Sequence, residues 1–89
     1  MKAIVTVIGK DQVGIIAGVC TVLAEKNINV LDISQTVMQD YFTMIMMVDI
    51  SEAGLTFEEL SRDLDEFGRT KGLSIRIQRE DIFEAMHRI

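Results

Sequence analysis

The sequence predicts an α+β fold whose strands and helices follow the order βαββαβ. Four short segments are rich in β-branched and apolar residues, as are strands that are partly or fully buried. Two longer segments repeat apolar residues at the spacing of an amphipathic helix. The 89 residues contain no proline and no low-complexity run, so we expect residues 1–89 to form a single domain.

The first half of the chain predicts a strand, a helix and a second strand. Ala3–Ile8 is apolar on both faces, as a covered central strand is, and Gly9 is expected to end it. A helix is expected over Gly14–Lys26, with Asn27 at its C-terminal cap, and a second strand over Ile28–Met38. The apolar residues that recur at helical spacing in this helix are Ile16, Val19, Cys20 and Leu23.

The middle of the chain predicts a third strand and a second helix. After a turn at 39–41, Phe42–Ile50 places its apolar residues at every second position, which is typical of a strand with one buried face. Thr56 and Glu59 have the spacing of a capping box, so a helix is expected to begin at Phe57. The expected apolar stripe of this helix consists of Phe57, Leu60, Leu64 and Phe67.

The end of the chain completes the predicted fold. Gly72 is expected to end the second helix, and Leu73–Gln78 alternates apolar with polar residues, as a half-exposed strand does. Asp81–Ile89 is expected to form a short C-terminal helix. Two interlocked βαβ-type halves then give the ferredoxin-like sandwich, an antiparallel four-stranded sheet with two helices on one face and right-handed crossovers.

Composition and charge argue against several classes of function. The formal net charge is −5, so we expect no direct binding to nucleic acid. No apolar run is long enough for a membrane span, and Met1–Ile4 lacks the zones of a signal peptide. Together with a single cysteine, these features predict a cytoplasmic protein. Hydrophobic residues make up 48% of this short chain, which predicts that a second subunit covers part of its apolar surface.

Residues typical of catalysis are scarce. His87 and Cys20 are the only residues of their types, and neither lies in a nucleophile motif. No spacing is typical of a metal site, and the glycines form neither a phosphate-binding loop nor a dinucleotide fingerprint. We therefore expect no catalytic residue, metal or cofactor. Cys20 is expected to be a buried thiol, and packing is the expected role of Met44, Met46 and Met47.

Two short motifs carry a family resemblance. The loop G-K-D-Q-V-G-I-I at 9–16 leaves the first strand and opens the first helix, and N-I-N-V at 27–30 opens the second strand. With the element order and the length, this pattern resembles the ACT domains, small regulatory modules attached to many enzymes of amino-acid metabolism. It is most similar to stand-alone bacterial ACT-domain proteins and to one half of the glycine cleavage system transcriptional repressor.

The resemblance implies a ligand site that two subunits share. ACT domains commonly associate through sheet edges or helices, and amino acids often bind between the first loop of one domain and the second strand of its neighbour. In the serine-sensing ACT domain of phosphoglycerate dehydrogenase, a polar loop residue and an asparagine hold the ligand. Those positions correspond here to Asp11 and Asn29. Asp11 is a carboxylate where the serine sensor has a neutral amide, so serine is a doubtful ligand.

The chemistry of these residues independently suits an amino acid. Gly14 permits a sharp turn or a close approach, and the helix that starts there presents unpaired N–H groups to a carboxylate. Asp11 can pair with an ammonium group, and Asn29 offers a donor and an acceptor. The predicted ligand-binding residues are Asp11, Gln12, Val13, Gly14, Ile15 and Asn29.

Structural roles remain open for the same residues. Asp11 could be the N-cap or a turn residue of the first helix, Gly14 a turn glycine, and Asn29 a partner of backbone groups after that helix. At the level of function, a homo-oligomeric module that binds an amino acid and regulates a metabolic enzyme or regulator is one hypothesis. The alternative is a ligand-free protein–protein interaction subunit that uses the ACT dimer as a scaffold. The acidic face of the second helix is expected to be a solvated surface, with partner docking as the other interpretation: Glu58, Glu59, Asp63, Asp65 and Glu66.

Overall fold

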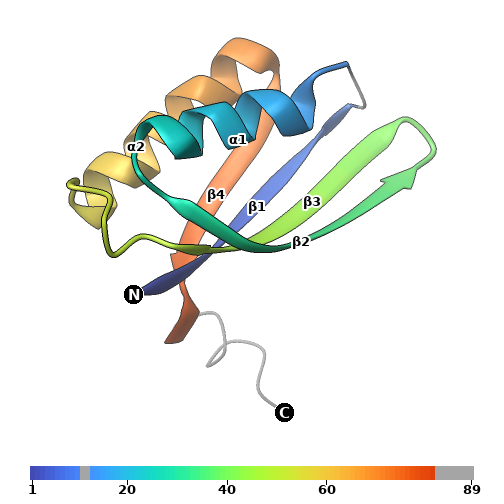
Figure 1. The fold of residues 1–89 in the computed structure, drawn as a ribbon. Helices are drawn as coiled ribbons and strands as arrows, with labels where there is room; N and C mark the ends of the chain where they lie inside the picture. Colours follow the sequence, from blue (N-terminus) through green and yellow to red (C-terminus); the bar gives the residue numbers. More distant parts are fainter. Residues whose placement is uncertain (11–12, 82–89) are drawn as a thin grey trace.

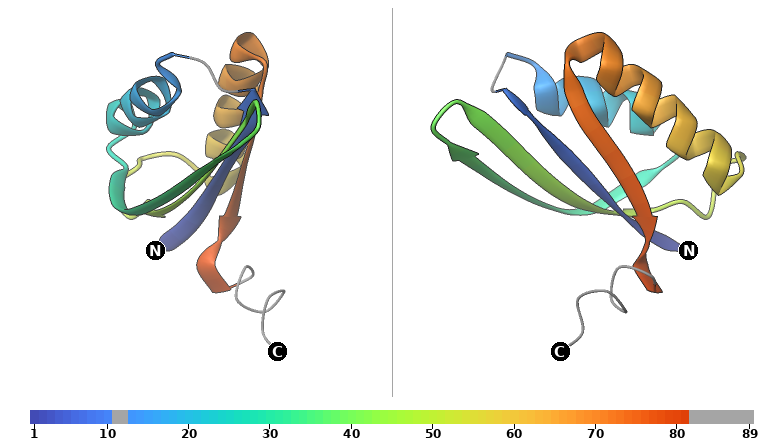
Figure 2. Two further views of the ribbon diagram at one scale, coloured as in Figure 1. Left: turned by 90° about the vertical axis from the view of Figure 1, so that its right-hand side faces the viewer. Right: turned by 180° about the vertical axis from the view of Figure 1, so that it is seen from behind.

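One antiparallel sheet carries two helices on one of its faces (Figure 1). The computed structural model describes residues 1–10 and 13–81. The sheet has the strand order β2-β3-β1-β4, and Figure 2 shows the helical layer and the sheet layer from two further sides. The predicted ferredoxin-like order is therefore confirmed. The elements are β1 (Lys2–Lys10), α1 (Ile15–Glu25), β2 (Asn29–Met38), β3 (Tyr41–Asp49), α2 (Phe57–Lys71) and β4 (Leu73–Arg79).

Local sequence fixes both ends of α2. The Thr56 hydroxyl accepts a hydrogen bond from the Glu59 N–H at 3.1 Å, and the Glu59 carboxylate accepts one from the Thr56 N–H at 3.0 Å. This is the predicted capping box. Gly72 follows the helix with φ 71, a left-handed conformation that glycine adopts without a side-chain clash, and it ends the helix as predicted.

The core lies between the helices and the facing side of the sheet. Every second residue of β1, β3 and β4 is buried there, and Leu60 and Leu64 of α2 pack on them. Phe57 and Phe67, at the ends of the predicted stripe, are half-buried at its margin. The strand residues of this core are Ala3, Val5, Val7, Phe42, Met44, Met46, Val48, Leu73, Ile75 and Ile77.

The buried face of α1 differs from the predicted one by one position. Ile15 is 6% exposed, whereas Ile16, which was expected to face inward, is 37% exposed. Ile15 shares one line with Val19 and Leu23, and Ile16 lies about 100° further around the helix. Cys20 is only partly buried, so the expectation of a buried thiol is wrong in degree. Two adjacent isoleucines fit the apolar period almost equally well, and only the packing separates them.

Several element boundaries also differ from the sequence prediction. Gly9 lies inside β1, where a Cβ would come within 2.5 Å of a Leu73 side-chain carbon, so this glycine permits close packing and does not end the strand. The C-cap of α1 is Lys26, and Asn27 follows it with φ 58. Tyr41 belongs to β3, which shortens the turn to two residues. Residues 82–89 of the predicted final helix lie outside the described residues.

The edge strand β2 is the least covered element of the sheet. Only Val30 of its ten residues is partly buried, and the other nine are exposed. The pairing with β3 shifts at Leu31, which is a bulge. Beyond the bulge, Ile33 pairs with the buried Met46, so it lies on the helix side of the sheet although it is 40% exposed. An edge with unpaired backbone groups and exposed apolar side chains is a template for pairing with another chain.

Candidate functional site

The N-terminus of α1 is open to solvent. Gly14 is the N-cap with φ 85, and no side chain of the described residues forms a cap hydrogen bond to the helix. No acidic residue lies in the first turn, and Val13 and Gly14 are both exposed. A Cβ on Gly14 would meet no atom within 4 Å, so the backbone conformation, and not crowding, requires glycine here. The first N–H groups of α1 therefore have no capping side chain among the described residues and suit an anionic group.

Two predicted site residues, Asp11 and Gln12, lie outside the described residues. The cap position nevertheless belongs to Gly14, so the alternative interpretation of Asp11 as the N-cap is wrong. The ligand and turn interpretations of Asp11 stay predictions. Val13, Gly14 and Ile15 are together at the start of α1, where Ile15 is buried and leaves only its backbone for ligand contact.

Asn29 lies at the opposite end of α1 from this loop. It is exposed at the start of β2, and it lines a shallow depression of about 550 Å³ with Ala24, Asn27, Ile28 and Glu52. The eleven residues of α1 span about 16 Å. The structure therefore does not bring Asn29 and the start of α1 into one site within a single chain.

The surroundings of Asn29 are acidic. Its register partner on β3 is Asp49, whose carboxylate accepts hydrogen bonds from the Ser51 hydroxyl at 2.6 Å and the Ser51 N–H at 2.9 Å. These two hydrogen bonds are the main cause of a lowered pKa of Asp49, and the N-terminal ammonium, 3.5 Å from the carboxylate, lowers it further by a smaller amount. Both effects favour the charged form of Asp49. The ammonium also donates to the Ser51 hydroxyl. With Glu52 nearby, this end of the molecule suits a cationic group better than an anionic one.

A groove runs between α1 and α2. It has a volume of about 540 Å³, and the apolar side chains of Val22, Phe67 and Leu73 line it. On the α1 side its wall includes the small residues Gly14, Ala17 and Gly18, and a Cβ on Gly18 would come within 3.3 Å of the Phe67 ring. The sequence pattern did not predict this groove. Its signal was the run of small residues spaced three or four apart on one side of α1.

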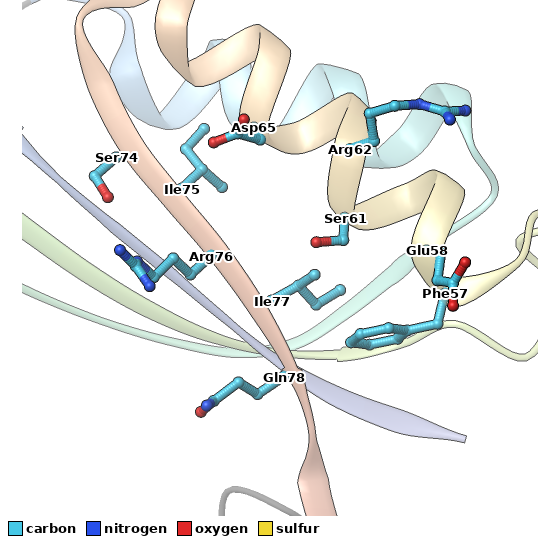
Figure 3. A pocket seen from close by; sticks show the side chains of 10 residues that line it. All are labelled: Phe57, Glu58, Ser61, Arg62, Asp65, Ser74, Ile75, Arg76, Ile77 and Gln78. Carbon is cyan, nitrogen blue, oxygen red and sulfur yellow. The ribbon is translucent and has the colours of Figure 1, made fainter.

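A second groove follows the free edge of β4 (Figure 3). It measures about 720 Å³ and lies between this strand and α2. Figure 3 shows Ile75 and Ile77 directed toward α2 and Arg76 directed to the other side of the strand. Arg62, Asp65 and Glu58 of α2 line it too, so its walls carry both charges.

The described residues hold no arrangement typical of an active site. No group of three or more His, Cys, Asp or Glu among them could hold a metal ion. In this part of the chain, the pKa is clearly lowered for Asp49 and Glu59, and local hydrogen bonds in a turn and a helix cap explain both shifts. Within residues 1–10 and 13–81, no helix has the length and apolar character to cross a membrane.

These features define a small α+β module of the ferredoxin-like class with an open helix N-terminus. The ACT domain family profile matches residues 2–78. A UPF0237 protein of Clostridium acetobutylicum is 60% identical over 89 residues, which covers 100% of both chains. The chain therefore belongs to the ACT domain family and to its UPF0237 group.

Solved structures agree with this assignment. An ACT domain protein from Streptococcus pneumoniae is 48% identical, with a TM-score of 0.84 and 98% of each chain covered. A protein assigned as a glycine cleavage system transcriptional repressor has a TM-score of 0.75 at 19% identity, over 88% of this chain and 44% of that one. The resemblance to stand-alone ACT-domain proteins that the sequence predicted is therefore confirmed. The resemblance to the repressor is confirmed as a shared fold alone.

Proposed function

We propose that this protein is a regulatory, non-catalytic module that binds an amino acid between two identical subunits. Within one chain, the start of α1 and Asn29 lie at opposite ends of α1. The Asn29 of a partner subunit can instead complete the site at the start of α1. The direction of the strands is the observation that carries this proposal.

A two-fold pairing of β2 strands places the two half-sites together. β1 and β2 are both antiparallel to β3, so both run in the same direction. The loop that follows β1 is therefore at the same end of the sheet as Met38, the last residue of β2. In an antiparallel pair of β2 strands, the start of the partner's strand lies against the end of this one. The partner's Asn29 is then at the same end of the sheet as the start of α1.

The exposed apolar surface supports the same pairing. α1 lies on the β2 side of the helical layer and α2 on the β4 side (Figure 2). Gly18 and Thr21 line the groove toward α2, whereas Ile16 and Cys20 lie on the opposite flank of α1, toward the β2 edge. A dimer through this edge would cover this flank together with Leu31, Ile33 and Val37 of β2. We expect it to bury about 800 Å² per subunit.

The two half-sites carry the groups that a zwitterion requires. The first N–H groups of α1 donate hydrogen bonds to the ligand carboxylate. Asp11 is the proposed partner of the ligand ammonium, and the partner's Asn29 adds a donor and an acceptor. The Asp11 carboxylate makes serine a doubtful ligand, because the loop then differs in charge from the amide of the serine sensor.

Titration with the twenty amino acids by calorimetry and thermal unfolding tests this proposal. A ligand with a Kd of about 100 μM, present at 1 mM, should raise the free energy of unfolding by about 1.4 kcal/mol. Light scattering should report a dimer at micromolar concentration. A chain that stays monomeric, or that binds none of the twenty, would contradict the proposal.

A ligand-free interaction subunit is the second candidate function, and the β4 edge is the observation that favours it. The pairing of β4 with β1 is uninterrupted from Leu73 to Arg79, and no strand among residues 1–10 and 13–81 pairs with the other edge of β4, beside the groove of Figure 3. An extended segment of a partner could add there as a strand. Under this alternative, the chain dimerises but no amino acid changes its thermal stability.

A further inference from the structure

The groove between α1 and α2 is continuous with the proposed ligand site. Val13, Gly14 and Ile15, which stand at the start of α1, also line the groove. The close approach of Gly9 to Gly72 and Leu73 brings the end of β1 next to the end of α2. A ligand whose carboxylate meets the start of α1 therefore has the mouth of the groove beside it.

The walls of the groove near this mouth suit an apolar group. Phe67 and Leu73 present carbon atoms from the α2 side, and Val22 lies further along α1. Ala17 is exposed and too small to fill the space beside it, whereas Gly18 lets the Phe67 ring approach α1 closely. The Thr21 hydroxyl, which also lines the groove, already donates to the Ala17 carbonyl oxygen at 2.8 Å.

Charged groups mark the two ends of the groove. Lys71 lies at the end nearest Gly14, next to Gly72. Glu25 lies at the other end, where its neighbour Lys26 forms an ion pair with Asp63 of α2 at 3.1 Å. The charge order along the groove, positive at the mouth and negative at the far end, matches a ligand that enters with its carboxylate at the mouth.

We infer that the ligand of this module is an amino acid with a large apolar side chain, such as leucine, isoleucine or methionine, and that this side chain occupies the α1–α2 groove. This inference rests on the proposed function, because the proposed site holds the ligand's charged groups. A groove of about 540 Å³ lies within the range of about 300–1,000 Å³ that small-molecule sites occupy. Glycine, alanine or serine would leave most of it empty and forfeit contacts with its apolar walls.

The preference has an expected size. Burying one methylene group contributes a factor of about four in affinity. Leucine has three more carbon atoms than alanine, so it should bind at least about tenfold more tightly even if the groove covers only part of its side chain. Polar side chains of similar length should gain nothing.

The test compares leucine with alanine by calorimetry, on the parent chain and on Ala17→Leu. Ala17 is exposed on α1, so the added side chain should fill the groove without disturbing the core. We expect Ala17→Leu to lose the preference for leucine while alanine binding stays unchanged. Ser61→Leu is the matched control, because it makes a similar enlargement in the groove beside β4 and should retain the preference.

Thr21→Leu provides a second filling variant if Ala17→Leu does not fold, as judged by circular dichroism. A parent chain that binds amino acids without preferring apolar ones would overturn the inference and leave the proposed function standing. So would an Ala17→Leu chain that keeps the full preference. A parent chain that binds none of them overturns the proposed function and this inference together.

Discussion

Single residues at the start of α1 and in the cap of α2 have separable roles. The structure assigns the α1 cap to Gly14, whose positive φ makes it a turn glycine. Asp11 is therefore not the N-cap residue of α1. The proposed role of Asp11, contact with a ligand ammonium, can be tested without a large loss of stability.

Asp11→Ala should abolish the stabilisation by an amino-acid ligand and leave the free energy of unfolding without ligand nearly unchanged. Had Asp11 been the helix cap, the same substitution would have cost about 1 kcal/mol. Asp40→Ala, at the exposed turn between β2 and β3, is the matched control for the loss of one negative charge. Thermal unfolding with and without ligand measures both effects, and unchanged ligand stabilisation in Asp11→Ala would remove this residue from the site.

Glu59 gives a pH dependence that reports on the cap of α2. Hydrogen bonds from the Thr56 N–H and hydroxyl hold the pKa of Glu59 below its usual value of 4.5. A carboxyl whose pKa is lowered in the folded state stabilises the fold above its unfolded pKa, and this contribution is lost as the pH falls through the folded pKa. Glu59→Gln should therefore be less stable than the parent at pH 7, and the difference should shrink below about pH 4.5. Denaturant titrations at both pH values measure it, and a difference that stays constant with pH contradicts this account.

At the scale of elements, α2 and β2 differ in what they bury. The α2 stripe packs on the sheet inside one chain, whereas β2 exposes nearly all its residues. The apolar stripe at helical spacing, the capping box and Gly72 were strong enough to give the limits of α2 from sequence. The limits of β2 were also predicted to within one residue, but the exposure of β2 and the inward face of α1 depend on packing between elements, which the local period does not encode.

Leu64→Ala tests the core of α2. Leu64 is fully buried in the core, so its truncation should lower the free energy of unfolding by about 2–5 kcal/mol through lost burial and a residual cavity. Ile8→Ala, on the half-exposed opposite side of the sheet, should cost much less. Urea denaturation of both variants compares them. A loss below about 1 kcal/mol for Leu64→Ala would show that α2 packs differently.

Ile33→Lys tests the β2 edge as a dimer interface. A lysine on an edge strand opposes pairing with another chain, so this variant should become monomeric at micromolar concentration. Ile45→Lys is the control: Ile45 is 42% exposed, close to the 40% of Ile33, but it pairs with Thr6 and Ser34 on the other face of the sheet. Light scattering should report a dimer for Ile45→Lys. A dimeric Ile33→Lys chain and a monomeric Ile45→Lys chain would place the interface on the face of the sheet that the helices do not cover.

For the whole molecule, the sequence predicted the fold almost completely, whereas the ligand-binding role of the site residues stays a prediction. Periodicity, the capping box and Gly72 were local signals, and the structure confirms the elements that they predicted. The motif at 9–16 led to the open start of α1. Neither groove was predicted, because a groove depends on the distance between two elements rather than on the residues of one. The separation of Asn29 from the loop follows from their places at opposite ends of α1, and it agrees with the shared site that the family resemblance implies.

The whole molecule also links ligand binding to assembly. If the ligand contacts both subunits, it must strengthen dimerisation by the same factor by which dimerisation strengthens binding. This linkage rests on one claim, that Asp11 and Asn29 of the same site belong to different chains.

A calorimetric titration of mixed variants tests that claim most directly. Asp11→Ala and Asn29→Ala chains, each defective in binding alone, are unfolded together and refolded as a mixture. In a mixed dimer, one site loses both residues and the other keeps both, so about a quarter of all sites should bind the ligand with the parent's affinity if chains pair at random. Either variant refolded by itself should recover none. If each site belonged to one chain, the mixture would recover no sites, and that result would contradict the shared site.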